Sequence, residues 1–231
     1  NRAEGLDSSA FGSNNQALAQ GSTALGYHNQ ATADDTTAVG YENEAFGNYS
    51  TAVGYHNHAL EADSTAIGHE NIALGTSSTA LGTLNSATGE MSNAIGSNNE
   101  ASADYSHASG TYNLASADDA SAIGFKNDAT AYASTALGHQ NQAKGDESVA
   151  VGASNEALAE YSTAVGNYNS ATEVDSSAIG SYNSAEAENS NAFGSFNSAT
   201  AANSNAFGTG NIVGEYAANS NAFGTGNIVE E

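Results

Sequence analysis

The sequence contains no cysteine and no proline, and only three of its 231 residues are lysine or arginine. Without cysteine, the chain forms neither a disulfide nor a thiolate metal site. No segment approaches the ~20 consecutive apolar residues that a membrane-spanning helix needs. Against the three basic residues stand 26 Asp and Glu residues, which give a formal net charge of −23. Nucleic acid and anionic membranes are therefore poor partners, because binding them needs a positive field.

The sequence also begins without the pattern of a secretion signal and has low hydrophobicity, and both features bear on how the protein is organised. Residues Asn1 to Asp7 do not have the pattern of a secretion signal, so we expect this chain to be an internal piece of any secreted protein. Low hydrophobicity with high net charge is typical of disorder. A strict internal repeat opposes that interpretation, since a disordered segment has no reason to keep a register.

The repeat is fourteen residues long. A glycine occurs at every fourteenth position from Gly12 to Gly208, with an alanine two residues before it and an asparagine three residues after it. Such periodicity is typical of a chain built from one short unit stacked many times. It favours neither an enzyme nor a cofactor-binding protein, and no nucleophile, base and acid set emerges.

A coiled coil does not fit this repeat, because each unit has one strongly apolar position and carries glycine and asparagine in every helical stretch. A period of two fits. We predict two strands of about five residues per unit, as in 22–26 and 29–33. Gly26 and Asn29 would bracket a turn with positive φ. Stacked units then form an all-β, parallel β-solenoid of about sixteen coils.

The apolar residue before each glycine is predicted to supply the core, with the threonines of residues 23, 37, 51, 65 and 79 pointing inward beside it. This column consists of Phe11, Leu25, Val39, Val53, Ile67, Leu81, Ile95, Ile123, Leu137, Val151, Val165, Ile179, Phe193 and Phe207, with one polar member, Ser109. The alternate alanine column, such as Ala24, would face outward. Small residues in an unbroken column indicate close approach of another backbone, so we expect a closed cyclic assembly.

The repeated motif resembles the head domain of YadA-like trimeric autotransporter adhesins. Clear copies are Ser64-Thr65-Ala66-Ile67-Gly68, Ser92-Asn93-Ala94-Ile95-Gly96 and Ser148-Val149-Ala150-Val151-Gly152. The resemblance implies a left-handed parallel β-roll, a homotrimer, display on a bacterial cell surface and a role in adhesion. It also implies anchoring in the outer membrane through a neck, stalk and barrel that lie outside this sequence. Members often carry valine where this chain has Thr23 and its equivalents.

The repeat divides the chain into residues 1–213, which keep the fourteen-residue period, and residues 214–231. The segment 203–213 recurs as 219–229 at a spacing of sixteen. Because terminal repeats of solenoids are atypical, we interpret residues 214–231 as a register-shifted repeat that forms a cap or a transition toward a neck.

Three sets of residues are candidates for contacts. Aromatic residues recur in columns and would form stacked ladders or ligand contacts: Tyr27, Tyr41, Tyr55, Tyr168, Tyr182 and Phe196. Acidic residues gather at the second turn and would form a solvated surface or a cation ridge: Asp34, Asp35, Asp118, Asp119, Asp146 and Glu147. Six histidines include His28, His56 and His58, but no tight triad emerges, and no metal site or cofactor is predicted.

The leading hypothesis is an adhesin head, a rigid trimeric rod that attaches to host matrix proteins, cells or abiotic surfaces by many weak contacts. The alternative is a structural spacer or fibre segment without its own ligand. Ice binding by a threonine ladder is a third hypothesis, which the predicted inward direction of the threonines disfavours.

Overall fold

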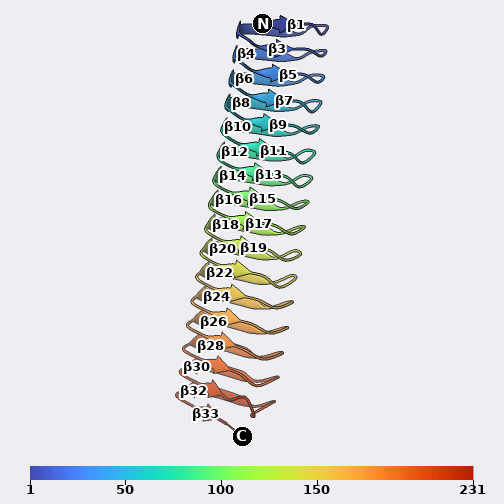
Figure 1. Ribbon diagram of the computed structural model, residues 1–231. Helices are drawn as coiled ribbons and strands as arrows, with labels where there is room; N and C mark the ends of the chain where they lie inside the picture. Colours follow the sequence, from blue (N-terminus) through green and yellow to red (C-terminus); the bar gives the residue numbers. More distant parts are fainter. Residues whose placement is uncertain (231) are drawn as a thin grey trace. The chain divides into compact units, whose positions relative to one another are not determined.

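The computed structural model describes residues 1–230, which form strands and turns without a helix. Two compact units divide the chain, Asn1–Ser116 and Ala117–Glu231. Within each unit the backbone winds into stacked coils, each with one long and one short strand (Figure 1). The prediction of an all-β, parallel β-solenoid of about sixteen fourteen-residue coils is confirmed.

In the first unit the long strands form one parallel ladder and the short strands another. The long strands are β2 (Ser9–Ser13), β4 (Thr23–Tyr27), β6 (Thr37–Tyr41), β8 (Thr51–Tyr55), β10 (Thr65–His69), β12 (Thr79–Thr83), β14 (Asn93–Ser97) and β16 (His107–Thr111). The short strands are β1 (Arg2–Ala3), β3 (Gln16–Ala17), β5 (Gln30–Ala31), β7 (Glu44–Ala45), β9 (His58–Ala59), β11 (Ile72–Ala73), β13 (Ser86–Ala87), β15 (Glu100–Ala101) and β17 (Leu114–Ala115).

The second unit repeats this pattern. Its long strands are β18 (Ser121–Phe125), β20 (Thr135–His139), β22 (Val149–Ala153), β24 (Thr163–Asn167), β26 (Ser177–Ser181), β28 (Asn191–Ser195), β30 (Asn205–Thr209) and β32 (Asn221–Thr225). Its short strands are β19 (Asp128–Ala129), β21 (Gln142–Ala143), β23 (Glu156–Ala157), β25 (Ser170–Ala171), β27 (Ser184–Ala185), β29 (Ser198–Ala199), β31 (Ile212–Val213) and β33 (Ile228–Val229). The prediction of a five-residue second strand over residues 29–33 is therefore wrong, because the chain turns again after Ala31.

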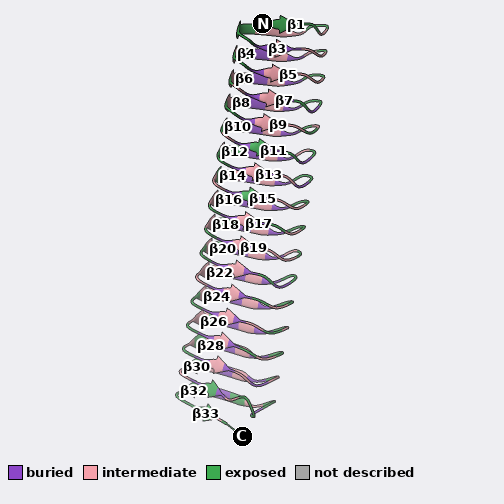
Figure 2. Cartoon of the chain, viewed as in Figure 1, coloured by how far each residue is buried: buried purple, intermediate pink, exposed green. Residues whose placement is uncertain are grey.

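The interior of each coil is lined by small side chains, and the predicted core is inverted. Ala24 and Ala31 are fully buried, whereas Leu25 is 45% exposed and Phe11 is 64% exposed. Successive side chains of a strand point to opposite faces, and here the alanine takes the inner one. Figure 2 shows this alternation of buried and more exposed residues along the strands. The fully buried apolar side chains are alanines, apart from Val213, which pairs with Ala199 in the last coils.

The threonines also lie on the outer face. Thr23 and Leu25 share the face opposite to Ala24, and Thr23 is half-buried while Leu25 is exposed. The prediction that this threonine column points inward is therefore wrong. The direction of the threonines therefore does not disfavour ice binding.

The repeat glycine is required by both conformation and space. Gly26 has a φ of 120° within β4, in the region that side chains disfavour. A Cβ atom there would overlap the carbonyl oxygen of Gly40 in the next coil and lie 3.1 Å from Nδ2 of Asn29. The predicted positive φ at the glycine is confirmed. The one predicted at Asn29 is wrong, since His28 takes it, with a φ of 60°.

The asparagine after each glycine belongs to a buried ladder. The Nδ2 atom of Asn29 donates to Leu25 O at 3.0 Å, to Gly40 O at 2.7 Å and to Oδ1 of Asn15 at 3.0 Å. The Oδ1 atom of Asn29 accepts from the backbone N and Nδ2 of Asn43 at 3.1 and 2.9 Å. Because buried amide groups must be paired, each coil fixes the position of the next.

The extra residues near the C-terminus are taken up by a turn. Strands β30 and β32 pair in register as Asn205 with Asn221, and the asparagine ladder continues from Asn211 to Asn227 with an Nδ2–Oδ1 distance of 2.8 Å. Residues 214–220 between β31 and β32 form turns. The stacking of coils therefore survives the change of spacing from fourteen to sixteen residues.

Candidate functional site

The outward face of the long strands carries the large apolar residues. We call the residues directly before the repeat glycines the aliphatic column. Its exposed members include Leu25, Leu81, Ile123 and Leu137, whose exposed fractions range from 36 to 45%. Monomeric soluble proteins rarely expose extended contiguous apolar patches, so a surface of this kind marks an interaction site.

One aromatic ladder lies on the same outward face, directly after the repeat glycines. We call it the Tyr27 ladder: Tyr27, Tyr41, Tyr55 and His69. The ring centroids of Tyr27 and Tyr41 are 5.2 Å apart, those of Tyr41 and Tyr55 5.0 Å, and those of Tyr55 and His69 5.0 Å. The predicted stacking is confirmed, and Tyr27, Tyr41 and Tyr55 remain 40 to 44% exposed.

A second aromatic ladder occupies a different column in the second unit. The Tyr168 ladder consists of Tyr168, Tyr182 and Phe196, two residues after their glycines, at φ values of 54 to 57°. The centroids of Tyr168 and Tyr182 are 5.0 Å apart and those of Tyr182 and Phe196 are 5.1 Å apart, with nearly parallel rings. We call this column of positive φ the corner column. Its rings present their edges to solvent, with exposed fractions of 49 to 61%.

Carboxylates lie close enough to two tyrosines to change their titration. Glu42 raises the pKa of Tyr41 above the ordinary value of 10.0, by its charge and by a hydrogen bond to the phenol. The charge of Glu147, followed by that of Glu160, raises the pKa of Tyr161. In both cases the phenolate would form beside an existing negative charge, which disfavours it.

The predicted acidic residues all lie exposed on the second turn. They are Asp34, Asp35, Asp118, Asp119, Asp146 and Glu147. Part of their hydrogen-bonding capacity is already used, since Oδ1 of Asp34 accepts from the backbone N of Gln20 at 3.2 Å and Oδ1 of Asp146 accepts from that of Tyr132 at 3.2 Å. These carboxylates thus help to hold the turns of adjacent coils together.

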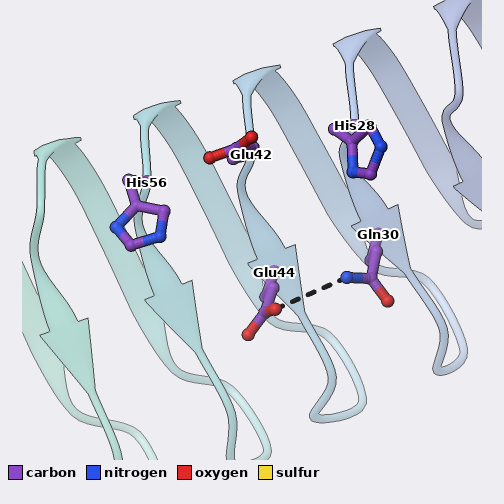
Figure 3. Close-up of a pocket in the computed structure, with 5 residues that line it drawn as sticks. All are labelled: His28, Gln30, Glu42, Glu44 and His56. Carbon is purple, nitrogen blue, oxygen red and sulfur yellow. Dashed lines mark hydrogen bonds between the residues drawn. The ribbon is translucent and has the colours of Figure 1, made fainter.

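Histidine and glutamate line a shallow pocket in the first unit, which sequence reasoning did not predict. His28, Glu42 and His56 follow one another along the corner column, and Gln30 and Glu44 lie beside them on β5 and β7 (Figure 3). Nε2 of Gln30 is 3.4 Å from Oε1 of Glu44. Side chains of the corner column and of the short strands therefore lie next to each other across coils.

A close contact between His58 and Glu44 lies beside this pocket. Nδ1 of His58 lies 2.7 Å from Oε2 of Glu44, and the rings of His56 and His58 are 5.0 Å apart. In residues 1–230 no group of three or more His, Asp or Glu side chains is arranged to hold a metal ion. The described part of the chain also has no helix long and apolar enough to cross a bilayer.

Comparison with known families identifies the repeat. The YadA head domain repeat, a unit of two copies, matches residues 3–29, 31–57, 59–85, 87–113, 115–141, 129–155, 143–169, 157–183 and 171–197. The chain belongs to the YadA head family. A search of curated proteins found no match. Membership in the YadA head family makes this an adhesin-like β-solenoid domain, of a class that is typically not enzymatic.

The match to the YadA head family covers both units but stops at residue 197. Beyond it lie the last coils and the turn at residues 214–220. The repeat glycines and asparagines recur throughout the matched residues, where the glycines lie within the long strands and the asparagines form the buried ladder.

Proposed function

We propose that this YadA head is the adhesive part of a homotrimeric bacterial surface protein. It attaches to matrix proteins, cells or abiotic surfaces through many weak contacts that act together. The observation that carries the proposal is the outward aliphatic column on a chain that belongs to the YadA head family. Left-handed winding of the coils and anchoring in an outer membrane, through segments outside this sequence, are part of the proposal.

The aliphatic column supports the trimer. Leu81 is 40% exposed in the single chain, so covering its exposed part would stabilise an association by about 1 kcal/mol, and the column offers such a residue in almost every coil. Two further copies around a threefold axis would cover this face on all three chains at once. The column has a polar member only at Ser109 among residues 11–207.

The exposed ladders and turns are left for the ligand. Tyrosine and phenylalanine rings locked in stacks lose little conformational entropy on binding, which suits them to adhesive contacts. In this proposal Tyr168, Tyr182 and Phe196 contact the ligand. Tyr27, Tyr41 and Tyr55 share the face of the aliphatic column, so they contact either the ligand or the neighbouring copy. The acidic turns keep the head soluble and offer sites for cations or basic partners.

Two measurements test this proposal. Sedimentation equilibrium of the purified chain at micromolar concentration should give three times the chain mass, and a monomer mass would overturn the trimer. Beads coated with the head should attach to matrix proteins or cells in a saturable manner. Attachment should fall when Tyr168, Tyr182 and Phe196 are changed together to serine, and beads carrying that variant serve as the control.

A passive spacer is the second candidate, because stacked coils separate whatever precedes and follows them. Cells that lack this segment would then attach as well as cells that carry it, provided that a spacer of equal length replaces it. Thermal hysteresis of the purified head tests ice binding directly, since the five threonines from Thr23 to Thr79 lie on the outer face.

A further inference from the structure

The Tyr168 ladder ends at an unoccupied position. One face of the Phe196 ring stacks on Tyr182, so its other face points along the corner column toward the next coil. There the column holds Gly210, and one coil further it holds Gly226. A Cβ atom added at Gly210 or at Gly226 would meet no atom within 4 Å. The exposed face of Phe196 therefore looks onto a shelf of bare backbone.

The side of this shelf is apolar. Ile212 lies on the short strand β31 and is 41% exposed, and Ile228 follows it one coil further on β33. Within one coil, a side chain on the corner column lies next to the side chain two residues later on the short strand. His56 and His58 show this in the first unit, where their rings are 5.0 Å apart. We call the surface formed by Phe196, Gly210, Gly226, Ile212 and Ile228 the ring shelf.

The ring shelf is also uncharged within a strongly acidic chain. Residues 195–198, 209–212 and 225–228 read SFNS, TGNI and TGNI, without an acidic or basic residue, although the chain has a net charge of −23. Uncharged apolar surface of this kind is the part of a charged protein that other molecules cover.

Few polar groups remain free on the shelf to recognise a sugar. The amides of Asn197 and Asn211 are engaged in the buried ladder, with Nδ2 of Asn211 2.8 Å from Gly224 O and 3.0 Å from Oδ1 of Asn197. The backbone N of Gly210 donates to Ser195 O at 2.9 Å, and that of Gly226 donates to Thr209 O at 2.9 Å. A planar apolar ring needs none of these hydrogen bonds.

We propose that the ring shelf binds an aromatic side chain of a partner polypeptide, which stacks on Phe196 above Gly210 as the next ring of the Tyr168 ladder. Offset parallel stacking at a centroid distance near 5 Å is favourable for aromatic pairs, and the ladder already has this geometry. The isoleucines cover the edge of the bound ring. The biological role of this binding rests on the adhesive function proposed above. The partner is a protein with exposed aromatic residues.

The probe for the experiment is N-acetyltryptophanamide, with methyl β-galactopyranoside as the sugar alternative. Saturation-transfer difference NMR on the intact chain should show transfer to the indole that saturates at millimolar concentration, as expected for one stacked ring. Phe196→Asn should abolish this transfer by removing the platform. Asn is suited to the positive φ there, since Asn98 occupies the same column with a φ of 54°.

Gly210→Tyr fills the shelf with the chain's own ring and should also abolish transfer to the indole. The fold should tolerate it, because Tyr182 occupies the same column at a φ of 54°. Gly210→Asn is the matched control, which changes the same backbone position without adding a ring and should retain the transfer. Circular dichroism of each variant confirms that the chain is folded.

Indole transfer that persists in folded Gly210→Tyr or Phe196→Asn overturns the proposal, and so does its absence from the unaltered chain. A galactoside signal that is lost in the same two variants while the indole gives none would also overturn it and assign the shelf to sugars. Ring binding is measured here without any surface attachment. A head that binds the indole but fails the bead assay would therefore refute the adhesive function alone.

Discussion

The two faces of each long strand differ in a way that ordinary hydrophobicity does not suggest. Ala24 is fully buried inside the coil, while Leu25, its neighbour, is 45% exposed. The inner face is filled mainly by alanine, serine and asparagine, and the outer face carries leucine, valine, isoleucine and phenylalanine. The inner face is therefore selected for size and hydrogen bonding, and the outer face for contacts with other molecules.

The comparison implies that the two faces contribute to different equilibria. The buried asparagine ladder holds one coil on the next, so changes to it should affect folding. The aliphatic column is half solvent-exposed in the single chain, so changes to it should affect association. The variants below separate these effects, beginning with the largest.

Loss of a single ladder asparagine should have the largest effect. Asn85→Ala removes the acceptor, Oδ1, that pairs with the backbone N and Nδ2 of Asn99 at 3.1 and 3.0 Å, and the donor that reaches Gly96 O at 2.9 Å. Because several buried groups lose their partners, we expect the free energy of unfolding to fall by about 3–5 kcal/mol. Denaturant unfolding measures it. Asn93→Ala, on the outer face, is the control and should cost less than about 1 kcal/mol.

A change in the aliphatic column should weaken association by an intermediate amount. Leu81→Ser removes an apolar residue that is 40% exposed in the single chain, and we expect the proposed trimer to lose about 1 kcal/mol per chain, or about 3 kcal/mol in total. Sedimentation equilibrium measures the dissociation. Leu84→Ser changes a leucine on the corner column that is 47% exposed, and it should leave the proposed trimer intact. Equal weakening by both variants would contradict the assignment of the interface.

Relief of a positive φ should stabilise the chain. Leu84 has a φ of 55°, which costs a leucine roughly 1 kcal/mol, so Leu84→Gly should raise the free energy of unfolding by about that amount. Leu74→Gly is the comparison, since Leu74 is 39% exposed on the outer surface and its φ is not positive. That variant should be destabilised. Thermal unfolding of the two variants should therefore shift in opposite directions.

Removal of a ring from a ladder should have an effect of similar size and opposite sign. Tyr182→Ser breaks two stacked contacts, with Tyr168 and Phe196, and should cost about 1 kcal/mol. Tyr161→Ser is the matched control. Tyr161 has a similar exposure and a φ of 57°, but Glu147 and Asp175 occupy its place in the neighbouring coils. An equal loss in both variants would show that stacking contributes nothing to stability.

The smallest effect should be a change in titration. The raised pKa of Tyr41 means that its phenol holds the proton more tightly in the folded chain. Its contribution to stability is complete below the ordinary tyrosine pKa and is lost as the pH rises through the folded one. Glu42→Gln removes the first cause, so ultraviolet absorbance should show the phenol of residue 41 titrating at lower pH. Glu44→Gln should leave this titration unchanged.

Much of the fold could be predicted from the spacing alone. The fourteen-residue period implied parallel stacking in register, and the glycines implied a positive φ within each coil. The direction of the side chains was predicted wrongly, because period two assigns Thr23 and Leu25 to one face without stating which face is inside. The buried role of Asn29 was missed for a similar reason, since asparagine is frequent in turns and its burial depends on partners in adjacent coils.

Some of the candidate contacts could likewise be predicted from the sequence, and others could not. Stacking of Tyr27 on Tyr41 and of Tyr168 on Tyr182 follows from residues that recur at the repeat length. The pocket of His28, Glu42 and Glu44 does not follow from the repeat length, because it joins two columns whose proximity depends on how the corner is folded. Nor does the sequence show that the glycines at 210 and 226 leave the face of a ring uncovered.

The amino-acid sequence by itself determined that this chain stacks fourteen-residue coils and belongs to the YadA head family, because the spacing of glycine and asparagine recurs without regard to the residues between them. Only the tertiary structure decided which face of each strand is inside. The inner face buries the methyl group of Ala24 and the hydrogen-bonded amide of Asn29, whereas Leu25 is 45% exposed on the opposite face. The large apolar residues therefore lie outside, where a second chain or a ligand can bury them.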